Sequence, residues 1–387
     1  MSLASLIESW GDGAVLAMAG LAIGLAFGAF AQRSTFCFRA AAIETSRGQF
    51  GSRFAIWLIA FAAAIALTQG LIVAGFLDVK EARQLTGQGS VSGAVIGGLM
   101  FGVGMIMARG CASRLLVLAA TGNLRALVNG LILTLVAQAS LRGALSPARE
   151  AIGGWWTIEG GSVRNLLEWS GFGHGAGLML GLVLLAGGVV LAKRNQIGLW
   201  TGLGTFGVGA MIAASWLVTY VISQISFEPV TVKSISFTGP SADTLMGLIN
   251  SPSIPLGFDV GLVPGVFLGS LVAAVLSRTF HIEGFHGGTC MIRYIAGAAL
   301  MGFGSMLAGG CAVGAAVTGT SVFALTGVLA LASMWAGGAV TDWLLDRTPA
   351  EQPAAPAALA TAPRRGAVAV AMEQPREVHA TEGALPA

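Results

Sequence analysis

Long apolar stretches recur along the chain and are separated by short segments that carry most of its charges. A helix rises 1.5 Å per residue, so about 20 apolar residues cross the hydrocarbon core of a bilayer. The pattern therefore predicts an all-α polytopic membrane protein with about nine transmembrane helices. The predicted spans are 13–32, 54–77, 90–108, 122–141, 174–192, 197–223, 258–280, 293–308 and 321–341.

Composition supports the membrane assignment and excludes an ordinary soluble domain. Charged residues make up 10% of the chain, whereas soluble domains carry about 25%. The uncharged run from Tyr294 to Thr341 is long enough for two crossings with a further segment between them. The net charge of +3 is uninformative, because in a membrane protein the placement of charge matters more than its sum.

Four apolar pieces between the spans are too short to cross a bilayer, and each surrounds one of the four cysteines. They are 33–46 around Cys37, 109–121 around Cys111, 284–292 around Cys290 and 309–320 around Cys311. Each opens with glycine or polar residues. Irregular backbone at membrane depth is tolerated only where protein buries it or where it lines a cavity. We therefore predict four short re-entrant loops or half-helices.

Two of these pieces are near copies of each other. Gly102-Val-Gly-Met-Ile-Met-Ala-Arg-Gly-Cys111-Ala and Gly302-Phe-Gly-Ser-Met-Leu-Ala-Gly-Gly-Cys311-Ala share six of eleven positions. The first copy follows the third predicted span and the second follows the eighth. An odd offset makes the copies enter from opposite faces of the membrane, so the pattern predicts two inverted repeats with a substrate site near the midplane.

The repeats divide the chain into five parts. We expect an N-terminal segment (1–12), a first membrane repeat (13–141), an outer loop with linking spans (142–256), a second membrane repeat (257–345) and a disordered cytoplasmic tail (346–387), which is rich in Pro and Ala.

Positive charge is distributed unevenly between the two predicted sides. Fifteen of the 21 lysines and arginines fall on the side that holds the C-terminus. Because cytoplasmic loops carry an excess of Lys and Arg, we expect a periplasmic N-terminus and a cytoplasmic C-terminus.

Glycine followed by cysteine at the start of a half-helix has a specific chemistry. The positive end of a helix dipole attracts anions and favours a reactive thiol, and the glycines Gly110 and Gly310 allow close approach of a ligand. Cys37 occupies a similar piece between Arg33 and Arg39, and its expected counterpart is Gly287-Gly-Thr-Cys290-Met-Ile-Arg293.

Each of these residues also has a purely structural interpretation. A buried cysteine is usually a small hydrophobic residue, and glycine pairs such as Gly102 and Gly104 usually permit close helix packing. Duplication favours function for Cys111 and Cys311. Arginine inside apolar sequence is costly and usually functional, which directs attention to Arg39 and Arg109, whereas Arg114 is equally consistent with snorkelling to the interface.

The two Gly-Cys-Ala elements, the upstream Ser34-Thr-Phe-Cys37-Phe-Arg39 and the arrangement of spans resemble the YeeE/YedE family of bacterial inner-membrane transporters for sulfur compounds. The resemblance covers about residues 13–345 and implies an hourglass-like molecule that takes up thiosulfate. It also implies that three cysteines, which match Cys37, Cys111 and Cys311, line a central path, while Cys290, Arg39, Arg109, Gly110 and Gly310 are possible further contributors.

The resemblance further implies a thiosulfate-like anion as substrate, membrane lipid as surroundings, and a small TusA-like sulfur carrier as a possible cytoplasmic partner. We expect no enzyme activity, no nucleic-acid binding, no cofactor and no metal site. Passage by stepwise S–H···S contacts suits a soft dianion, because conduction requires weak sites.

Three other functions fit the same residues. One is transport of another sulfur or selenium species, because a soft site holds several of them. Another is a thiol–disulfide oxidoreductase, although such enzymes place two cysteines close in sequence and here no two are nearer than Cys290 and Cys311. The last is a purely structural membrane scaffold, against which the duplicated thiols argue.

Overall fold

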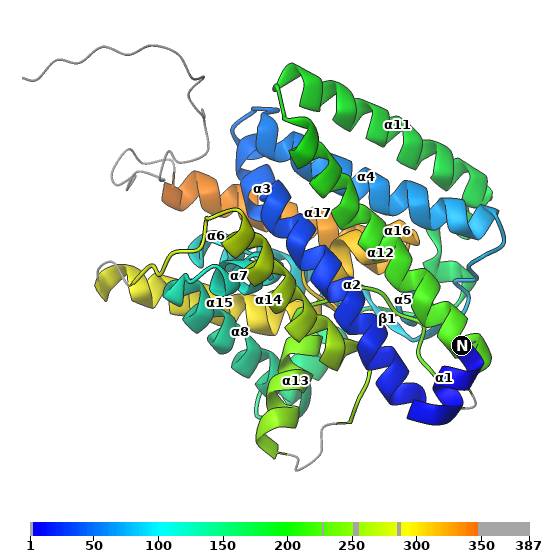
Figure 1. Ribbon diagram of the computed structural model, residues 1–387. Helices are drawn as coiled ribbons and strands as arrows, with labels where there is room; N and C mark the ends of the chain where they lie inside the picture. The colour runs from blue at the N-terminus through cyan, green and yellow to red at the C-terminus, as the bar shows by residue number, and fades with distance from the viewer. Residues whose placement is uncertain (1–2, 227, 251–254, 285–287, 347–387) are drawn as a thin grey trace, which may run out of the picture. The chain divides into compact units, whose positions relative to one another are not determined.

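The chain folds almost entirely into helices, as Figure 1 shows. The computed structural model describes residues 3–226, 228–250, 255–284 and 288–346. Its long helices are α2 (Asp12–Ser34), α4 (Ser52–Val73), α6 (Val91–Met107), α8 (Leu124–Arg142), α11 (Gly173–Arg194), α12 (Leu199–Ile225), α14 (Phe258–Leu276), α15 (Gly288–Leu307) and α17 (Leu325–Thr341).

Shorter elements lie before, between and after these helices. They are α1 (Leu3–Trp10), α3 (Phe38–Ser46), α5 (Arg83–Thr86), β1 (Gly89–Ser90), α7 (Ala112–Ala120), α9 (Ser146–Gly153), β2 (Thr157–Ile158), the 3₁₀ helix η1 (Ser162–Arg164), α10 (Leu166–Ser170), α13 (Thr238–Asn250), the π-helix η2 (Ala312–Thr318), α16 (Gly319–Ser321) and the π-helix η3 (Asp342–Asp346). The two strands pair antiparallel. The predicted C-terminal tail, from residue 347 onward, lies outside the described residues.

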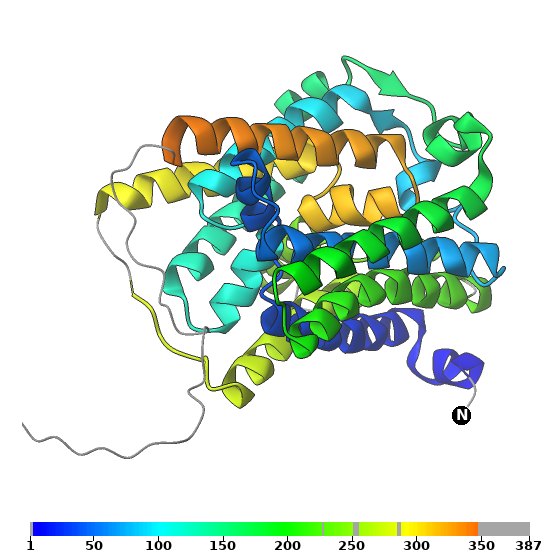
Figure 2. The same ribbon diagram turned by 90° about the horizontal axis from the view of Figure 1, so that it is seen from above.

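Each of the nine predicted spans coincides with a long helix. Among the described residues, eight helical stretches are long and apolar enough to cross a membrane, and the pair Met291–Leu307 and Ala312–Ser321, bent by 40°, makes a ninth if it is counted as one span. Figures 1 and 2 show α1 and the end of α17 on opposite sides of the helices. An odd number of crossings has this consequence.

Three of the four predicted short pieces form half-helices that begin directly after a cysteine. Cys37 precedes α3, Cys111 precedes α7, and Cys311 precedes η2, which continues into α16. The stretches 12–46 and 91–120 each form one candidate span, so α3 and α7 prolong the helices before them. The third piece, Ala312–Ser321, follows Met291–Leu307 after a bend of 40°.

The prediction of a fourth short piece, 284–292, is wrong for the residues of it that the structure describes in α15. Gly288 begins α15, which then continues to Leu307. The backbone first turns sharply at Gly309, where φ is +80°, and glycines inside the helix do not interrupt it. The stretch 285–287 lies outside the described residues. The additional short helix is instead α13, in the region predicted to link the two repeats.

Close packing of glycine-bearing helices holds the long helices together. Three glycines spaced four residues apart in α2 (Gly20, Gly24 and Gly28) and three in α14 (Gly261, Gly265 and Gly269) face the backbone of the other helix. An added Cβ at Gly24 would lie 2.5 Å from the carbonyl oxygen of Leu262. The predicted packing glycines behave in the same way, because an added Cβ at Gly102 would meet the carbonyl oxygen of Met334 on α17 at 2.3 Å. Small residues let membrane helices approach closely without a hydrophobic driving force.

Replacing Gly24 with Val should therefore separate α2 from α14 and destabilise the protein by about 1–3 kcal/mol, the usual cost of overpacking a well-packed interior. The measurement is the midpoint of thermal unfolding in detergent. Gly187→Val is the matched control, because an added Cβ at Gly187 on α11 would meet nothing within 4 Å. Equal midpoints for the two variants would contradict the packing role.

Candidate functional site

The three half-helices bring three thiols to the ends of short helices in the interior. Cys37, Cys111 and Cys311 are free thiols, and each is the residue that caps the N-terminus of its helix. Cys111 and Cys311 are 1% and 0% exposed, whereas Cys37 is half-buried. Each thiol therefore lies where the partial positive charge of a helix terminus is directed.

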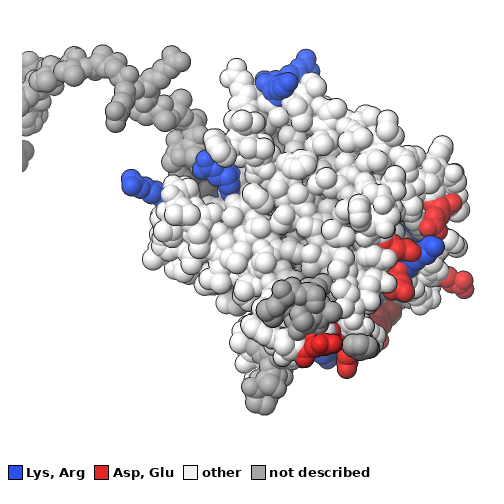
Figure 3. Space-filling model, turned by 45° about the vertical axis from the view of Figure 1, so that its right-hand side comes forward, with Lys and Arg blue, Asp and Glu red and all other residues white. Residues whose placement is uncertain are grey.

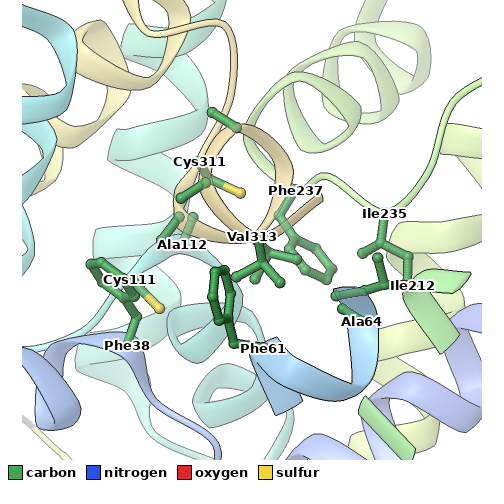
Figure 4. Packing of buried hydrophobic residues seen from close by; sticks show 14 of the residues in the cluster. Phe38, Phe61, Ala64, Cys111, Ala112, Ile212, Ile235, Phe237, Cys311 and Val313 are labelled. Carbon is green, nitrogen blue, oxygen red and sulfur yellow. The ribbon is translucent and has the colours of Figure 1, made fainter. Parts of the chain in front are cut away.

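These thiols belong to one neighbourhood. Cys111 lies within electrostatic range of both Cys37 and Cys311. Figure 4 shows Cys111 and Cys311 in the same apolar cluster, together with Phe38, Phe61 and Val313. Segments distant in the sequence thus converge, as the duplicated motifs predict.

The backbone before the two duplicated thiols takes the same unusual conformation. Arg109 and Gly309, which occupy matching positions, have φ values of +58° and +80°. A left-handed conformation suits glycine and is strained for arginine. Both breaks therefore turn the chain sharply two residues before the cysteine.

Hydrogen bonds fix the half-helix that follows Cys311. At its start, the backbone N–H of Gly314 donates to the sulfur of Cys311 over 3.4 Å. At its end, the buried side chain of Gln69 donates to the Ser321 carbonyl oxygen over 2.8 Å, and the indole of Trp216 donates to the Ser321 hydroxyl over 3.2 Å. An N–H that points at the sulfur leaves the thiol proton of Cys311 available for another acceptor.

Sequence reasoning missed the extended segment that precedes α13 and packs against this half-helix. The hydroxyl of Thr318 donates to the Ile235 carbonyl oxygen over 2.9 Å, and the next residue, Ser236, leaves no room for a side chain at Gly314. Phe237 is buried in the same apolar cluster as Cys311. The available signal was the alternation of apolar and polar residues at Ile235, Ser236 and Phe237, which is typical of an extended segment. The segment has no cysteine and is too short to be a span, so sequence reasoning passed over it.

Arg114 lies close to two of the thiols. It lies within electrostatic range of Cys37, Cys111 and Arg53, and its Nη1 atom is buried with no hydrogen-bond partner. Arg109, which sequence reasoning favoured, instead lies over the ring of Tyr294 at 5.8 Å. A buried nitrogen of this kind needs an acceptor.

The other candidates are only partly informative. Arg39 is half-buried on the first turn of α3. Gly110 and Gly310 are buried directly before the two duplicated thiols. Cys290 is the third residue of α15, but its side chain lies outside the described residues, so its role stays a prediction.

A polar cavity of about 290 Å³ reaches the second helix break. Gly309, Gly314 and Ala315 line it, so it extends to within a few residues of Cys311. Four cationic side chains line it as well: Arg83 on α5, Arg149 on α9, Arg164 on η1 and Lys233 in the segment before α13. Asp259 is the one carboxylate among the described lining residues. We call this space the cationic cavity.

Part of the cationic cavity is preorganised. Arg164 is only 6% exposed and donates to the Gly87 carbonyl oxygen over 2.5 Å and to the Thr326 hydroxyl over 2.9 Å, while its Nε atom is buried without a partner. The predicted outer loop thus contributes Arg149 and Arg164 to the cavity, which loop composition did not reveal. Fixed cationic donors with unused capacity are suited to bind an anion.

The arrangement can hold a small anion at two depths, first among the charges of the cationic cavity and then beside the thiols at the helix termini. Thiols donate weak hydrogen bonds, and a helix N-terminus attracts anions. Four cationic side chains line the first position, whereas the thiols supply the weak S–H donors of the second.

Comparison with known proteins shows to which family the chain belongs. The model of a family described as sulphur transport matches residues 33–340. The thiosulfate transporter TsuA of Escherichia coli (strain K12) is 26% identical over 348 residues, covering 85% of this chain and 94% of the relative. The thiosulfate transporter TsuA of Spirochaeta thermophila is 26% identical over 343 residues, covering 85% and 98%. The family match covers far more than half of the chain, and this protein therefore belongs to the sulphur transport (YeeE/YedE) family.

Proposed function

We propose that the protein takes up thiosulfate, or a closely related sulfur anion, through a central path lined by Cys37, Cys111 and Cys311. The observation that carries the proposal is the convergence of three free thiols at the N-termini of half-helices, with the cationic cavity beside them. The names of the two relatives specify thiosulfate.

We infer further that the chain consists of two inverted repeats. The order of elements supports this, because α2, α3, α4, α6, α7 and α8 are followed by α12, α13, α14, α15, η2 with α16, and α17. Long and short helices alternate in the same way in both series, with α11 between them. The shared turn at Arg109 and Gly309 is further support.

Helix packing follows the same correspondence. The pair α2–α14 matches α12–α4, and the pair α6–α17 matches α15–α8; all four pairs are in contact. The pairs α6–α15 and α2–α12, which a twofold axis would map onto themselves, are in contact as well. A pseudo-twofold axis would therefore pass between α6 and α15, close to Cys111 and Cys311.

This correspondence makes the path asymmetric. Residue 37, which precedes α3, matches residue 237, which precedes α13. The chain therefore has a thiol at Cys37 and a buried phenylalanine at Phe237 on the other side. On this assignment Cys290, at the start of α15, is not the partner of Cys37, and three thiols are the whole set along the path.

The substrate suits such a path. Thiosulfate is a dianion with a soft terminal sulfur, and three thiols in succession would give it several weak S–H contacts without a deep trap. Because Cys111 and Cys311 are buried, apolar neighbours such as Phe61 and Val313 must move for the ion to pass.

Surface charge supports the proposed orientation. Figure 3 shows a broad uncharged expanse between basic side chains at the top and left and mainly acidic side chains at the right and bottom. Basic residues favour the cytoplasmic side. The cationic cavity would then open to the periplasm and Arg114 would face the cytoplasm, where a TusA-like carrier stays a prediction from the family.

Replacing Cys111 or Cys311 with Ala should abolish uptake, because each removes one of the successive thiol sites while a small apolar side chain still fits the cluster. The assay is growth on thiosulfate, as the sole sulfur source, of a bacterium that lacks its sulfate and thiosulfate importers and carries this chain. Competition by sulfite, sulfide and selenium anions in uptake experiments then ranks the substrates.

Membrane insertion and thermal stability of each cysteine variant serve as controls. Ser variants at the same positions keep a hydroxyl and should rescue poorly, since the soft sulfur is lost. Undiminished growth by correctly inserted Ala variants would refute the thiol path. Failure of the unmodified chain to support growth on thiosulfate would refute the substrate.

Arg114→Gln should lower uptake by roughly tenfold or more, the scale for losing an interaction of a buried charge with an anion. Arg125→Gln is the matched control, because Arg125 lies over the Tyr294 ring at 5.2 Å and has no contact with the thiols in the part of the chain that the structure describes. Initial uptake rates at equal protein levels distinguish the two. Similar rates for both variants would remove Arg114 from the path.

A reporter that fluoresces only in the cytoplasm, fused after residue 347, should be active, whereas a periplasmic phosphatase fused there should be inactive. The physical reason is the excess of Lys and Arg on that side of the membrane. A fusion within the loop between α8 and α11 should give the opposite pair of results. Reversed activities would invert the proposed orientation and make the protein's cationic cavity cytoplasmic.

A further inference from the structure

An ion pair crosses the cationic cavity. The Nζ atom of Lys233 lies 2.5 Å from an Oδ atom of Asp259, and the two side chains are 24% and 18% exposed. Both residues line the cavity. An anion that enters the cavity therefore meets a lysine that already holds a carboxylate.

Local structure fixes both partners of this pair. Asp259 lies in the first turn of α14, where the helix dipole favours a carboxylate. Lys233 lies in the extended segment before α13, and its backbone is held by Thr219, whose hydroxyl donates to the Lys233 carbonyl oxygen over 2.7 Å. The lysine side chain is flexible while both backbones are fixed, so the ammonium group can change partner without rearranging the helices.

The segment that carries Lys233 continues directly to the thiol site. Ser234 and Ser236 also line the cationic cavity, and Ile235 accepts the hydrogen bond from Thr318 in the half-helix that follows Cys311. Lys233 is therefore the cavity cation on the same extended segment as the residues that pack against the half-helix after Cys311. An anion bound by Lys233 is at the point of transfer toward Cys311.

Arg149 is already paired with Glu150 at 2.9 Å, and the remaining three cations around a dianion would hold it too tightly for transport unless something opposed them. A neighbouring carboxylate weakens anion binding by repulsion and competes for the same ammonium group. Resting on the proposed function, we propose that Asp259 is the exchangeable counter-ion of Lys233: the incoming sulfur anion displaces Asp259 from Lys233, and the return of Asp259 releases the anion inward toward Cys311.

The opposite half of the chain lacks such a carboxylate at the corresponding position. Asp259 is the second residue of α14, and the second residue of α4 is Arg53, which donates to the Thr35 hydroxyl over 2.8 Å. Another acidic side chain, Asp243 on α13, lies within electrostatic range of Lys233, Asp259 and Arg83, and desolvation by burial raises its pKa whereas Arg142 lowers it. It is outside the cavity lining, so Asp259 is the carboxylate in direct competition with the anion.

The experiment measures thiosulfate uptake kinetics in proteoliposomes for the full chain and for Asp259→Asn. Loss of the competitor should lower both KM and the maximal rate by roughly three- to tenfold, between the effects of exposed and buried charge pairs. Asp259→Glu, which restores the charge, should return both values to within about twofold of the unmodified protein. Lys233→Met should raise KM, since the receiving cation is lost.

Glu81→Gln is the matched control, because Glu81 is an exposed carboxylate two residues from Arg83 and does not line the cavity; its kinetics should not change. A raised KM in Asp259→Asn would show that Asp259 only positions Lys233, and unchanged kinetics would show no role; either result overturns the inference. If Asp259→Asn fails to fold, the test is a lowered KM for Lys233→Arg together with a raised KM for Lys233→Met. Absence of thiosulfate uptake by the unmodified chain would instead refute the proposed function.

Discussion

The structure depends on one constraint: a helix that breaks within the membrane must have its free backbone groups satisfied inside the protein. Breaks occur before Cys37, Cys111 and Cys311, and each lies among buried residues. The broken helices α6 and α15 are in contact with each other, and α17 and α8 flank them. Glycine lets the backbones of neighbouring helices come into contact. The high glycine content of these helices therefore allows the breaks to be buried.

A buried break has a chemical consequence. It places helix termini, which attract anions, in surroundings where water cannot compete. Thiols are suitable capping residues there because an uncharged cysteine packs as a small hydrophobic side chain and still donates a weak hydrogen bond. A lysine or arginine in the same position would bind a dianion more tightly and cost more to bury. Near the thiols, formal positive charge is carried instead by residues such as Arg114 and by the side chains that line the cationic cavity.

The sequence predicts those features whose signals lie within a short stretch of the chain, and it misses those that depend on distant residues. Spans are set by runs of apolar residues, and all nine predicted spans coincide with long helices. The half-helices after Cys111 and Cys311 were predictable because the motif is duplicated. By contrast, α13 has 13 residues and no thiol, so neither length nor motif marks it. The cationic cavity combines loops more than a hundred residues apart, such as those of Arg83 and Lys233, and only tertiary structure brings them together. Arg114 was undervalued because two of its neighbours, Cys37 and Arg53, are likewise remote in sequence.

Asymmetry between the halves then gives the proposed path a direction. Two identical repeats would form the same entrance at both ends of the path. Such a path would bind an anion equally well from either side. On the proposed correspondence of the two repeats, Arg53 matches Asp259 and Cys37 matches Phe237. On this proposal, one entrance is the cationic cavity, which combines four cations with a competing carboxylate. The other entrance has a third thiol, Cys37, beside Arg114. On the proposed path, an anion that leaves the cationic cavity would next meet the buried thiols, whose S–H groups donate only weak hydrogen bonds. On this proposal, the divergence of the two related halves would separate the site of capture from the site of release.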